Sequence, residues 1–469
     1  MTKDINTLGG ATASPHGDFM GHPKGLYVLF LTEMWERLSY YGMRALLVLY
    51  MVNYLFIRPD VNEAVVGFST IKGVLEWAFG PLAIQPLSSQ IYGLYTGLVY
   101  ATPIIGGLVA DRWLGQRRTV IIGGIIMAAG HFLMAFENLF FPALFLLIIG
   151  NGAFKPNIST QVGDLYAPGD ARRDGAFTLF YMGINLGAVL SPLVCGTLGQ
   201  KFGWHYGFGA AGIGMIIGLC IYIFGQKYLV PHPDNAGHKI ENKSSLKGDK
   251  VKVPFTVAEK RGIVALIVLC ALNIVFWGVY EQQGNTMQLW ADNQTNWDFF
   301  GLWTMPSTWY QSFNPLTILI FAPILGIFWK WQAKSGSEPT SVTKMAIGCA
   351  LLAVAFGIMI FAAITVGGGR GSVGWLVATT LVLTIGELYL SPIGLSLVTK
   401  VAPARIVSMM MGMWFLSSAF GNYLSGYLGT YYEKMPKEYF FGLMAVLSVV
   451  AAIAMAAFNK PLRKTIGEH

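Results

Sequence analysis

The sequence predicts an all-α polytopic membrane protein of twelve transmembrane helices in two six-helix bundles. Three observations support this prediction. Of the 469 residues, 54% are hydrophobic and only 12% are charged, whereas roughly a quarter of the residues of a soluble domain are charged. The apolar residues form long runs, each near the ~20 residues that cross a ~30 Å hydrocarbon core. One long polar stretch, residues 229–259, divides these runs into six and six.

The twelve predicted spans are the apolar runs themselves. They cover residues 26–54, 88–110, 117–137, 141–163, 175–199, 206–228, 260–288, 312–332, 342–365, 374–399, 405–432 and 438–459. The predicted domains are a tail (1–25), an N-terminal bundle (26–228), a linker (229–259), a C-terminal bundle (260–459) and a second tail (460–469). Within the first external connection, residues 63–77 are either an amphipathic surface helix or an ordered loop.

The net charge of +8 reflects topology. When the loops are assigned alternately to the two sides, most Lys and Arg residues fall on the side that carries both termini. Because basic loops stay cytoplasmic, we predict a multi-pass protein of the plasma (inner) membrane with both termini inside, and no nucleic-acid partner. The four cysteines, Cys195, Cys220, Cys270 and Cys349, all lie in spans without metal-ligand spacing, so we interpret them as small hydrophobes.

Ionisable side chains inside the spans are the first candidates for a functional site, because charges in hydrocarbon are costly. Seven stand out: Glu33, Glu36, Arg37, Arg44, Lys155, Glu281 and Glu387. In the first span, polar residues recur at offsets that form one helical stripe, which must face protein or water. This stripe consists of Glu33, Glu36, Arg37, Tyr40, Tyr41 and Arg44. The alternative interpretation is a purely structural ion-pair network between helices.

Depth along the spans predicts which charges meet. At ~1.5 Å per residue, Glu33, Lys155 and Glu387 share one level, so Lys155 can pair with either carboxylate. Arg44 and Glu281 share another level, nearer the outer edge. We therefore predict a charged chamber at and below the midplane and an ion pair near the outer mouth.

Several motifs resemble those of a known family. Residues 106–118 (GGLVADRWLGQRR) are similar to the cytoplasmic loop signature of the major facilitator superfamily, although ordinary loop charge is the alternative. Residues 33–42 (EMWERLSYYG) resemble the ExxERFxYYG signature of the proton-coupled oligopeptide transporter (POT/PTR) family. Further similar segments are 150–157 (GNGAFKPN), 180–187 (FYMGINLG), 276–282 (FWGVYEQ), 386–392 (GELYLSP) and 414–418 (WFLSS). The resemblance implies the major facilitator fold.

The departures from the family pattern are mild. Leu38 replaces the usual Phe, and Gly93 stands where animal members carry a histidine, so proton handling must depend on carboxylates. Many bacterial relatives insert two helices between the halves, but the 229–259 linker is too short and too charged for them. The chain is identified as similar to bacterial-type members.

The resemblance implies an importer of di- and tripeptides by proton symport with alternating access, and it implies roles for residues. Glu387 takes the peptide amino group, and Arg37 and Lys155 face its carboxylate. The other residues implied in substrate binding are Tyr40, Tyr41, Tyr100, Asn157, Asn185, Trp277, Asn314, Trp414, Phe415 and Ser418. The residues implied in proton coupling are Glu33, Glu36, Arg37, Lys155 and Glu281, and those implied in gating are Arg44, Glu281, Asp111 and Arg112.

Proton coupling needs a carboxylate that is ionised beside a cation and protonated when the cation leaves. Glu33 or Glu36 against Lys155 or Arg37 has this design, as does Glu281 against Arg44, and the sequence does not decide among them. The expected partners are peptides, protons and membrane lipid. We expect a monomer with no cofactor, no metal and no catalytic residue.

Alternative functions remain open. On the same scaffold, a symporter of nitrate, another small anion or an amino-acid-like solute is possible, although Glu387 beside basic residues favours a zwitterion. A non-transporting peptide sensor is the alternative from another class. For the methionines at 409–411 and 413, a flexible packing surface is favoured over a copper site. His131 is interpreted as structural, and a membrane enzyme is disfavoured because no catalytic motif is found.

Overall fold

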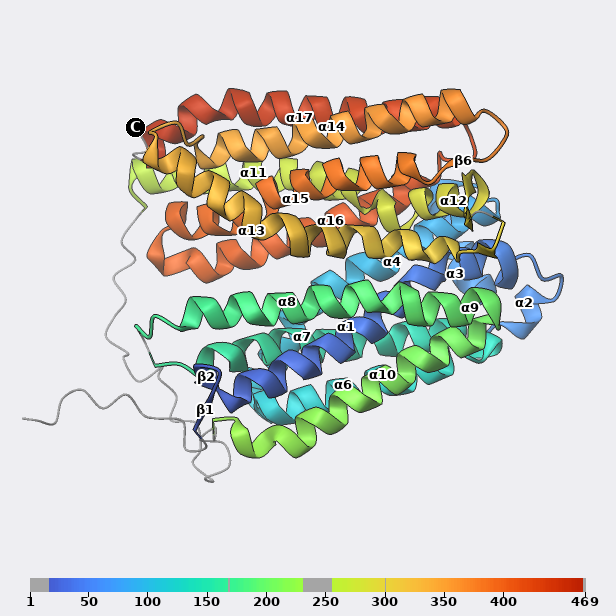
Figure 1. The fold of residues 1–469 in the computed structure, drawn as a ribbon, viewed down its shortest axis with the longest axis horizontal. Helices are drawn as coiled ribbons and strands as arrows, with labels where there is room; N and C mark the ends of the chain where they lie inside the picture. Colours follow the sequence, from blue (N-terminus) through green and yellow to red (C-terminus); the bar gives the residue numbers. More distant parts are fainter. Residues whose placement is uncertain (1–16, 168, 231–254, 300, 467–469) are drawn as a thin grey trace, which may run out of the picture.

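The structure is a computed structural model that describes residues 17–167, 169–230, 255–299 and 301–466. Its long helices run side by side along the longest axis, with the N-terminal half below the C-terminal half in Figure 1. The strand β1 (Asp18–Phe19) and the end of α17 lie at one end of the bundle, which we name the terminal face. The other end, with α2 and β6, is the opposite face. The predicted all-α membrane fold is confirmed, whereas residues 231–254 of the predicted linker lie outside the described residues.

Twelve long helices correspond to the predicted spans. They are α1 (Lys24–Tyr50), α4 (Ile84–Ala101), α6 (Gln116–Leu133), α7 (Phe140–Asp164), α8 (Arg173–Ser191), α10 (Trp204–Gly225), α11 (Val257–Tyr280), α13 (Phe313–Lys334), α14 (Ser341–Val366), α15 (Gly374–Val401), α16 (Val407–Gly429) and α17 (Lys437–Ile466). Within the described ranges, nine helical segments are long and apolar enough to cross a membrane. The other three are α1, α6 and α16, so the number of twelve spans stays a prediction.

Short helical segments extend or interrupt several of these helices. They are η1 (Met51–Leu55), α5 (Pro103–Val109), η2 (Ala110–Leu114), η3 (Glu137–Leu139), η4 (Pro192–Gly196), α9 (Thr197–Lys201), η5 (Gln226–Tyr228), η8 (Glu281–Gly284), α12 (Thr286–Asn293), η9 (Ser307–Ser312) and η10 (Ala404–Ile406). The predicted span 260–288 lies within the candidate membrane span Val257–Asn293, which is not one uninterrupted α-helix. The backbone leaves the helical region at Asn285, where φ is −114° and ψ is −98°, so α11 and α12 are separate helices joined by η8.

The connections at the opposite face carry structure of their own. Residues 63–77 form parts of two helices, α2 (Val61–Ala64) and α3 (Phe68–Phe79), so the helix alternative is correct. Three pairs of two-residue strands were not predicted: β1 with β2 (His22–Pro23), β3 (Thr295–Asn296) with β6 (Gly371–Ser372), and β4 (Asp298–Phe299) with β5 (Trp303–Thr304). At the terminal face, α17 continues to Ile466, so most of the predicted tail 460–469 is helical.

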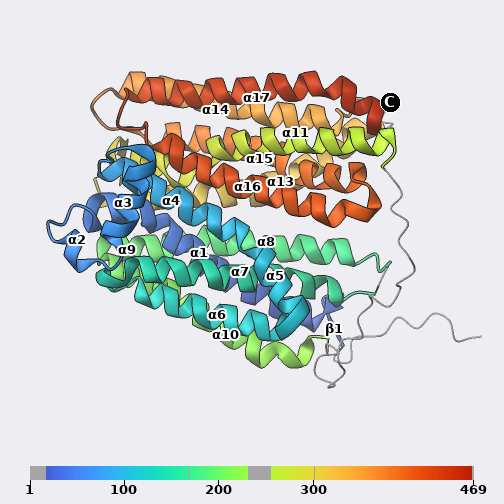
Figure 2. The ribbon, with the colours of Figure 1, turned by 180° about the vertical axis from the view of Figure 1, so that it is seen from behind.

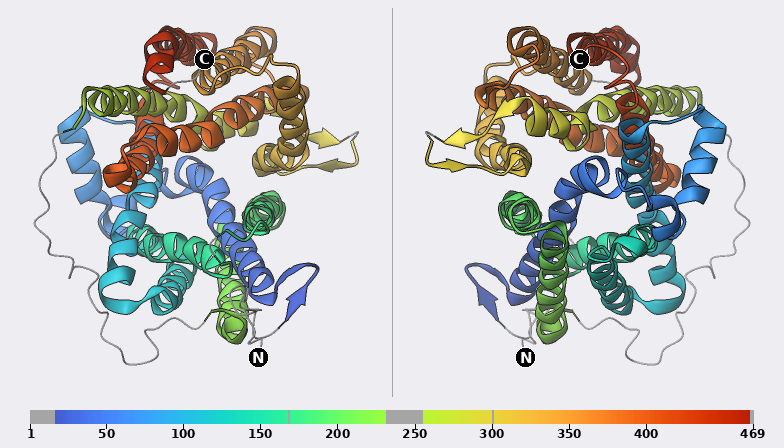
Figure 3. Two further views of the ribbon diagram at one scale, coloured as in Figure 1. Left: turned by 90° about the vertical axis from the view of Figure 1, so that its left-hand side faces the viewer. Right: turned by 90° about the vertical axis from the view of Figure 1, so that its right-hand side faces the viewer.

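In each half, one helix packs against two others. In the N-terminal half α1 packs against α8 and α10, and in the C-terminal half α14 packs between α15 and α17. The end-on views of Figure 3 show the two groups of helices facing each other. The halves meet along α4 with α16 and along α8 with α13, and Figure 2 shows the first of these pairs from behind.

Glycine permits the close approach of α4 to α16. A Cβ atom on Gly93 would lie 2.6 Å from the Cα of Gly426, and one on Gly97 would lie 3.0 Å from the carbonyl oxygen of Ala419. Small residues at such spacing are typical of tightly packed membrane helices. A larger side chain at Gly93 therefore has no room in this conformation.

A polar cluster ties the N-terminal strands to the connection between α7 and α8 at the terminal face. The Arg172 guanidinium pairs with Asp18 at 2.9 Å and with Asp170 at 2.8 Å. Hydrogen bonds from Arg172 hold the pKa of Asp170 below its usual range. The His22 ring lies 2.8 Å from the Tyr166 hydroxyl, whose pKa burial raises to about 12. These contacts hold β1 and β2 against the N-terminal half.

Two adjacent glycines on α5 test the packing. A Cβ atom on Gly106 would lie only 1.9 Å from the Gly152 carbonyl oxygen, whereas Gly107 has no neighbour within 4 Å. We expect Gly106→Ala to destabilise the protein by about 1–3 kcal/mol, as overpacking does, and to lower the melting temperature in detergent. Gly107→Ala should leave it unchanged or raise it slightly, because alanine favours helix. Equal melting temperatures for the two variants would contradict this packing of α5 against α7.

Candidate functional site

A cavity of ≈ 380 Å³ lies between the two halves. Side chains from both halves line it, so its shape depends on how the halves meet. The predicted site residues in its lining are Tyr41, Arg44, Tyr100, Lys155, Asn185, Trp277, Glu281, Asn314, Glu387, Trp414, Phe415 and Ser418. The structure therefore brings most of the predicted residues together, although they come from nine separate helical segments.

The cationic side of the cavity is Lys155 on α7. Its ammonium lies 4.5 Å from the centre of the Tyr100 ring, a cation–π contact. Within the described ranges, Lys155 forms no ion pair within 4 Å. The predicted pairing of Lys155 with Glu33 or Glu387 is therefore not formed in this conformation, and its charge faces the cavity.

The acidic side of the cavity is Glu387 on α15. The Tyr280 hydroxyl donates a hydrogen bond to its Oε2 atom, and Asn314 Nδ2 lies 3.3 Å from the same atom. Asn314 also donates to the Tyr280 hydroxyl at 2.8 Å and to Thr384 at 2.9 Å. Side chains from two other helices, α11 and α13, thus orient this carboxylate. Tyr280 was not among the predicted site residues, although it lies inside the motif 276–282.

A second charged group lies beside the cavity on α1. Arg37 Nε lies 3.2 Å from Glu33 Oε1, and Arg37 Nη2 donates to Glu36 Oε1 at 2.8 Å. All three residues are at most 2% exposed. Pairing with Arg37 was one of the alternatives that the sequence left open, because depth alone cannot tell which charges turn toward each other.

Three residues predicted to bind substrate lie outside the cavity lining. Arg37 is held by its two glutamates, and Tyr40 is buried with its hydroxyl unpaired within the described ranges. Asn157 donates to the Ala153 carbonyl at 2.7 Å. Asn185 does line the cavity, yet its amide donates to the Tyr181 carbonyl at 2.9 Å. The motif supplied these residues, but their orientation follows from helix packing.

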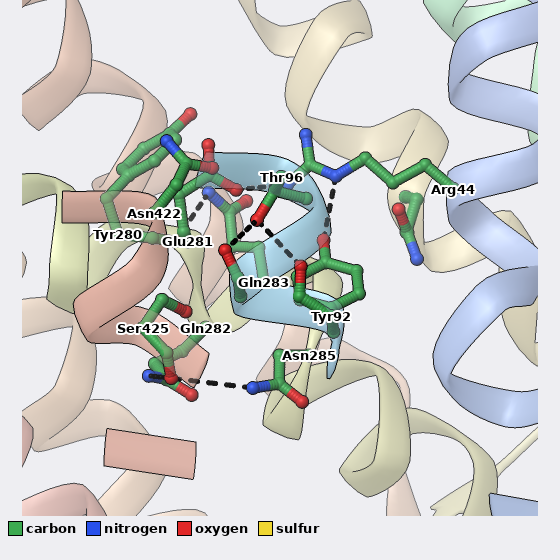
Figure 4. A network of polar contacts seen from close by, with 12 residues as sticks. Arg44, Tyr92, Thr96, Tyr280, Glu281, Gln282, Gln283, Asn285, Asn422 and Ser425 are labelled. Carbon is green, nitrogen blue, oxygen red and sulfur yellow. Dashed lines mark hydrogen bonds and ion pairs between the residues drawn. The ribbon is translucent and has the colours of Figure 1, made fainter. Parts of the chain in front are cut away.

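The predicted ion pair near the outer mouth is present. Arg44 Nη2 pairs with Glu281 Oε2, and Arg44 Nε donates to the Tyr92 hydroxyl at 2.7 Å. Figure 4 shows this pair within a larger polar network in which the amide of Gln282 donates to the Ser425 carbonyl at 2.9 Å. Glu281 is the first residue after α11, which ends at Tyr280. The end of α11 therefore places this carboxylate opposite Arg44.

Polar contacts between the halves gather toward the opposite face. Besides Arg44 with Glu281, they are Asn53 with Asp292, Gln85 with Gly429, Ser89 with Asn285, Gln200 with Asp292, Ser307 and Thr308, Thr197 with Trp309, and Val189 with Ser312. They come from the ends of helices at that face. The cavity is therefore closed toward the opposite face.

The predicted gate residues at the terminal face are arranged differently. Asp111 and Arg112 lie in η2, and both are exposed. In the part of the chain that the structure describes, neither forms an ion pair. The predicted latch at this loop is thus not formed in the conformation that is closed at the opposite face.

Two helical halves that enclose a cavity lined with opposite charges define the class of secondary transporters. The model of the POT family matches residues 117–245 and 234–449. The uncharacterized transporter YclF of Bacillus subtilis is 35% identical and aligns over 93% of both chains. The peptide transporter YePEPT of Yersinia enterocolitica is 34% identical over 99% of this chain and 98% of its own.

A solved structure agrees with these relatives. In a crystal structure of a peptide transporter POT in complex with alafosfalin, the protein chain is 33% identical in sequence to this chain. The structural alignment covers 96% of this chain and 97% of that chain, with a TM-score of 0.80. The chain belongs to the POT family, a family of transporters and not of enzymes.

The Arg44–Glu281 pair gives a prediction on stability. Arg44→Gln or Glu281→Gln alone leaves one buried charge without its partner, which costs about 3–5 kcal/mol. We expect either variant to lower the melting temperature in detergent strongly and the double variant to recover much of the loss. Asp60→Asn, at an exposed ion pair of the same face, is the control and should change nothing measurable. A double variant as unstable as the sum of the single variants would contradict a direct interaction.

Proposed function

We propose that this protein imports di- and tripeptides by proton symport, with alternating access of the cavity to the two membrane faces. The observation that carries the proposal is that one cavity is lined by Lys155 of one half and Glu387 of the other. A free peptide is a zwitterion, so it needs a cation at one end and an anion at the other. The volume of the cavity, ≈ 380 Å³, lies within the range of ~300–1,000 Å³ that is usual for ligand pockets.

Each charged residue retains capacity for a ligand. Lys155 has no ion-pair partner within 4 Å among the described residues, so its ammonium is available to the peptide carboxylate. Glu387 Oε2 accepts from Tyr280 and Asn314, whereas Oε1 accepts no hydrogen bond from the described residues and is available to the peptide ammonium. In this arrangement a bound peptide bridges the halves and lowers the cost of burying both charges.

Aromatic side chains form the other walls. Trp277, Trp414 and Phe415 line the cavity, and the ring of Trp277 stands edge-on to Tyr280 with centroids 5.2 Å apart. Aromatic faces contact many side-chain shapes without specific hydrogen bonds. We therefore propose that the cavity tolerates many peptide side chains but recognises the charged ends of the peptide strictly.

We assign the proton to the cluster of Glu33, Glu36 and Arg37. With both acids ionised, this buried cluster carries one net negative charge, and a single proton neutralises it. Arg37 contacts Oε1 of Glu33, while Glu33 Oε2 has no hydrogen-bond partner within the described residues. Glu33 Oε2 is therefore the proposed proton acceptor. Glu281 is a second acceptor whenever the halves part and Arg44 moves away.

The orientation follows from the charge of the loops. Basic loops stay cytoplasmic, so we propose that the terminal face is cytoplasmic and the opposite face external. The cavity is then closed to the outside in this conformation. A carrier of nitrate or of another small anion would have no use for Glu387, and a peptide sensor would have no use for the proton-binding acids.

Uptake into proteoliposomes tests the proposal. We expect an inward proton gradient and an inside-negative potential each to drive uptake of a neutral dipeptide. One charge crossing ~180 mV yields roughly 4 kcal/mol, at ~2.3 kcal/mol per 100 mV, which permits accumulation of about 10³-fold. An uncoupler is the control. Concentrative uptake that persists with the uncoupler present would rule out proton symport.

Modified peptides test the assignment of the two ends. Lys155→Ala should weaken binding of dialanine by about 10–100-fold, as the loss of a charged hydrogen bond does, and should hardly affect dialanine amide. Glu387→Gln should weaken dialanine but hardly affect N-acetylated dialanine. Binding is measured by competition against a labelled dipeptide in detergent. If Lys155→Ala weakens dialanine and its amide equally, Lys155 does not hold the peptide carboxylate.

A further inference from the structure

A second polar cluster joins the halves at the opposite face, around Asp292 on α12. Asn53 Nδ2 of the N-terminal half lies 3.0 Å from Asp292 Oδ2, and Gln200 Nε2 of the same half lies 3.3 Å from Oδ1. Ser307, in the C-terminal half, donates to Oδ1 at 2.5 Å. Asp292 thus accepts hydrogen bonds from two separate segments of the other half, η1 and α9.

The orientation of the Gln200 amide follows from its neighbours. The backbone N–H of Thr308 can only donate, and it lies 3.1 Å from Gln200 Oε1, which also accepts from the Thr308 hydroxyl at 2.9 Å. The amide nitrogen must then face Ser307 and Asp292. Donors and acceptors are complementary across this interface, and a carboxylate is the acceptor at its centre.

This cluster differs from the Arg44–Glu281 pair in its charge. Within the described ranges, no basic side chain pairs with Asp292, and its hydrogen-bond partners are the neutral groups of Asn53, Gln200 and Ser307. Hydrogen bonds to an ionised acceptor are roughly twice as strong as those between neutral groups. The negative charge therefore strengthens the interface without an opposing cation.

A chain of hydrogen bonds leads from Asp292 to the cavity. Ser307, which donates to Asp292, accepts from Gln288 Nε2 at 3.5 Å, and Gln288 Oε1 accepts from Gln311 at 2.9 Å. Gln311 lines the cavity. A ligand that moves Gln311 can thus affect Asp292 through the side chains of Gln288 and Ser307.

We propose that Asp292 is the central acceptor of a second latch, which stabilises the conformation closed at the opposite face and is connected to the cavity through Gln288 and Gln311. The proposal rests on the alternating access proposed above. Asp292 is a positioning residue in this account, because it lies outside the cavity lining. When the halves part at this face, its hydrogen bonds to Asn53 and Gln200 must break.

Distance measurements by electron spin resonance test the latch. Spin labels are placed at Tyr206 and Gly368, exposed positions of the two halves, on a background without native cysteines. Asp292→Asn replaces one acceptor oxygen by a donor, and we expect about a tenfold rise in the ratio of open to closed molecules. The matched control is Asp298→Asn, a nearby exposed carboxylate that accepts from its neighbour Gly301 at 3.2 Å, and it should leave the ratio unchanged.

A compensating variant separates the latch from a general loss of structure. In Asp292→Asn/Gln200→Glu the carboxylate comes from position 200 and the amide donor from position 292, so the closed state should be restored. If Asp292→Asn proves unstable, Gln200→Leu removes the same contact from the other half and should open the face equally. A closed-state ratio that neither Asp292→Asn nor Gln200→Leu shifts would overturn the latch. Because this measurement needs no peptide, a protein that fails to transport peptides would still answer it.

Discussion

The constraint on which the structure depends is that charges buried in a membrane protein need partners. On α1 this constraint is met in two ways. Arg37 pairs with Glu33 and Glu36 of its own helix, so this cluster stays together however the halves move. Arg44 pairs with Glu281 of the other half, so this pair must separate when the halves part. One helix therefore carries both a permanent charge cluster and a charge pair that depends on conformation.

This division suggests how binding and closure are connected. With both acids ionised, the Arg37 cluster carries one excess negative charge that a proton can neutralise, and it lies next to a cavity whose own cation, Lys155, is unpaired among the described residues. At the opposite face, the contacts between the halves include the Arg44–Glu281 ion pair and the neutral donors around Asp292. A peptide that supplies both end charges to Lys155 and Glu387 would pull the halves together at the level of the cavity. The two halves are then either closed around the peptide or open at one face.

Much of this arrangement could be predicted from the sequence, and the limits have physical causes. Depth follows from the constant rise of a helix, so the pairing of Arg44 with Glu281 was predictable although they are far apart in the chain. Rotation about the helix axis does not follow from depth, so the sequence left open whether Glu33 and Glu36 pair with Arg37 or with Lys155, and the orientation of Asn157 was missed. The break at Asn285 lies in the polar run 281–286 (EQQGNT), a signal that the assignment of this span passed over. Asp292 lies beyond the end of the span predicted over 260–288, where hydrophobic patterns give no information on contacts.

The central claim is that peptides bind in the cavity between Lys155 and Glu387. Crystals grown with alanyl-selenomethionine test it most directly, because selenium scatters anomalously and the protein's own methionines contain sulfur. The account predicts a selenium peak beside Trp277, Trp414 and Phe415, with peptide density reaching from Lys155 to Glu387. A selenium peak outside this cavity, or peptide density that contacts neither charged residue, would contradict it.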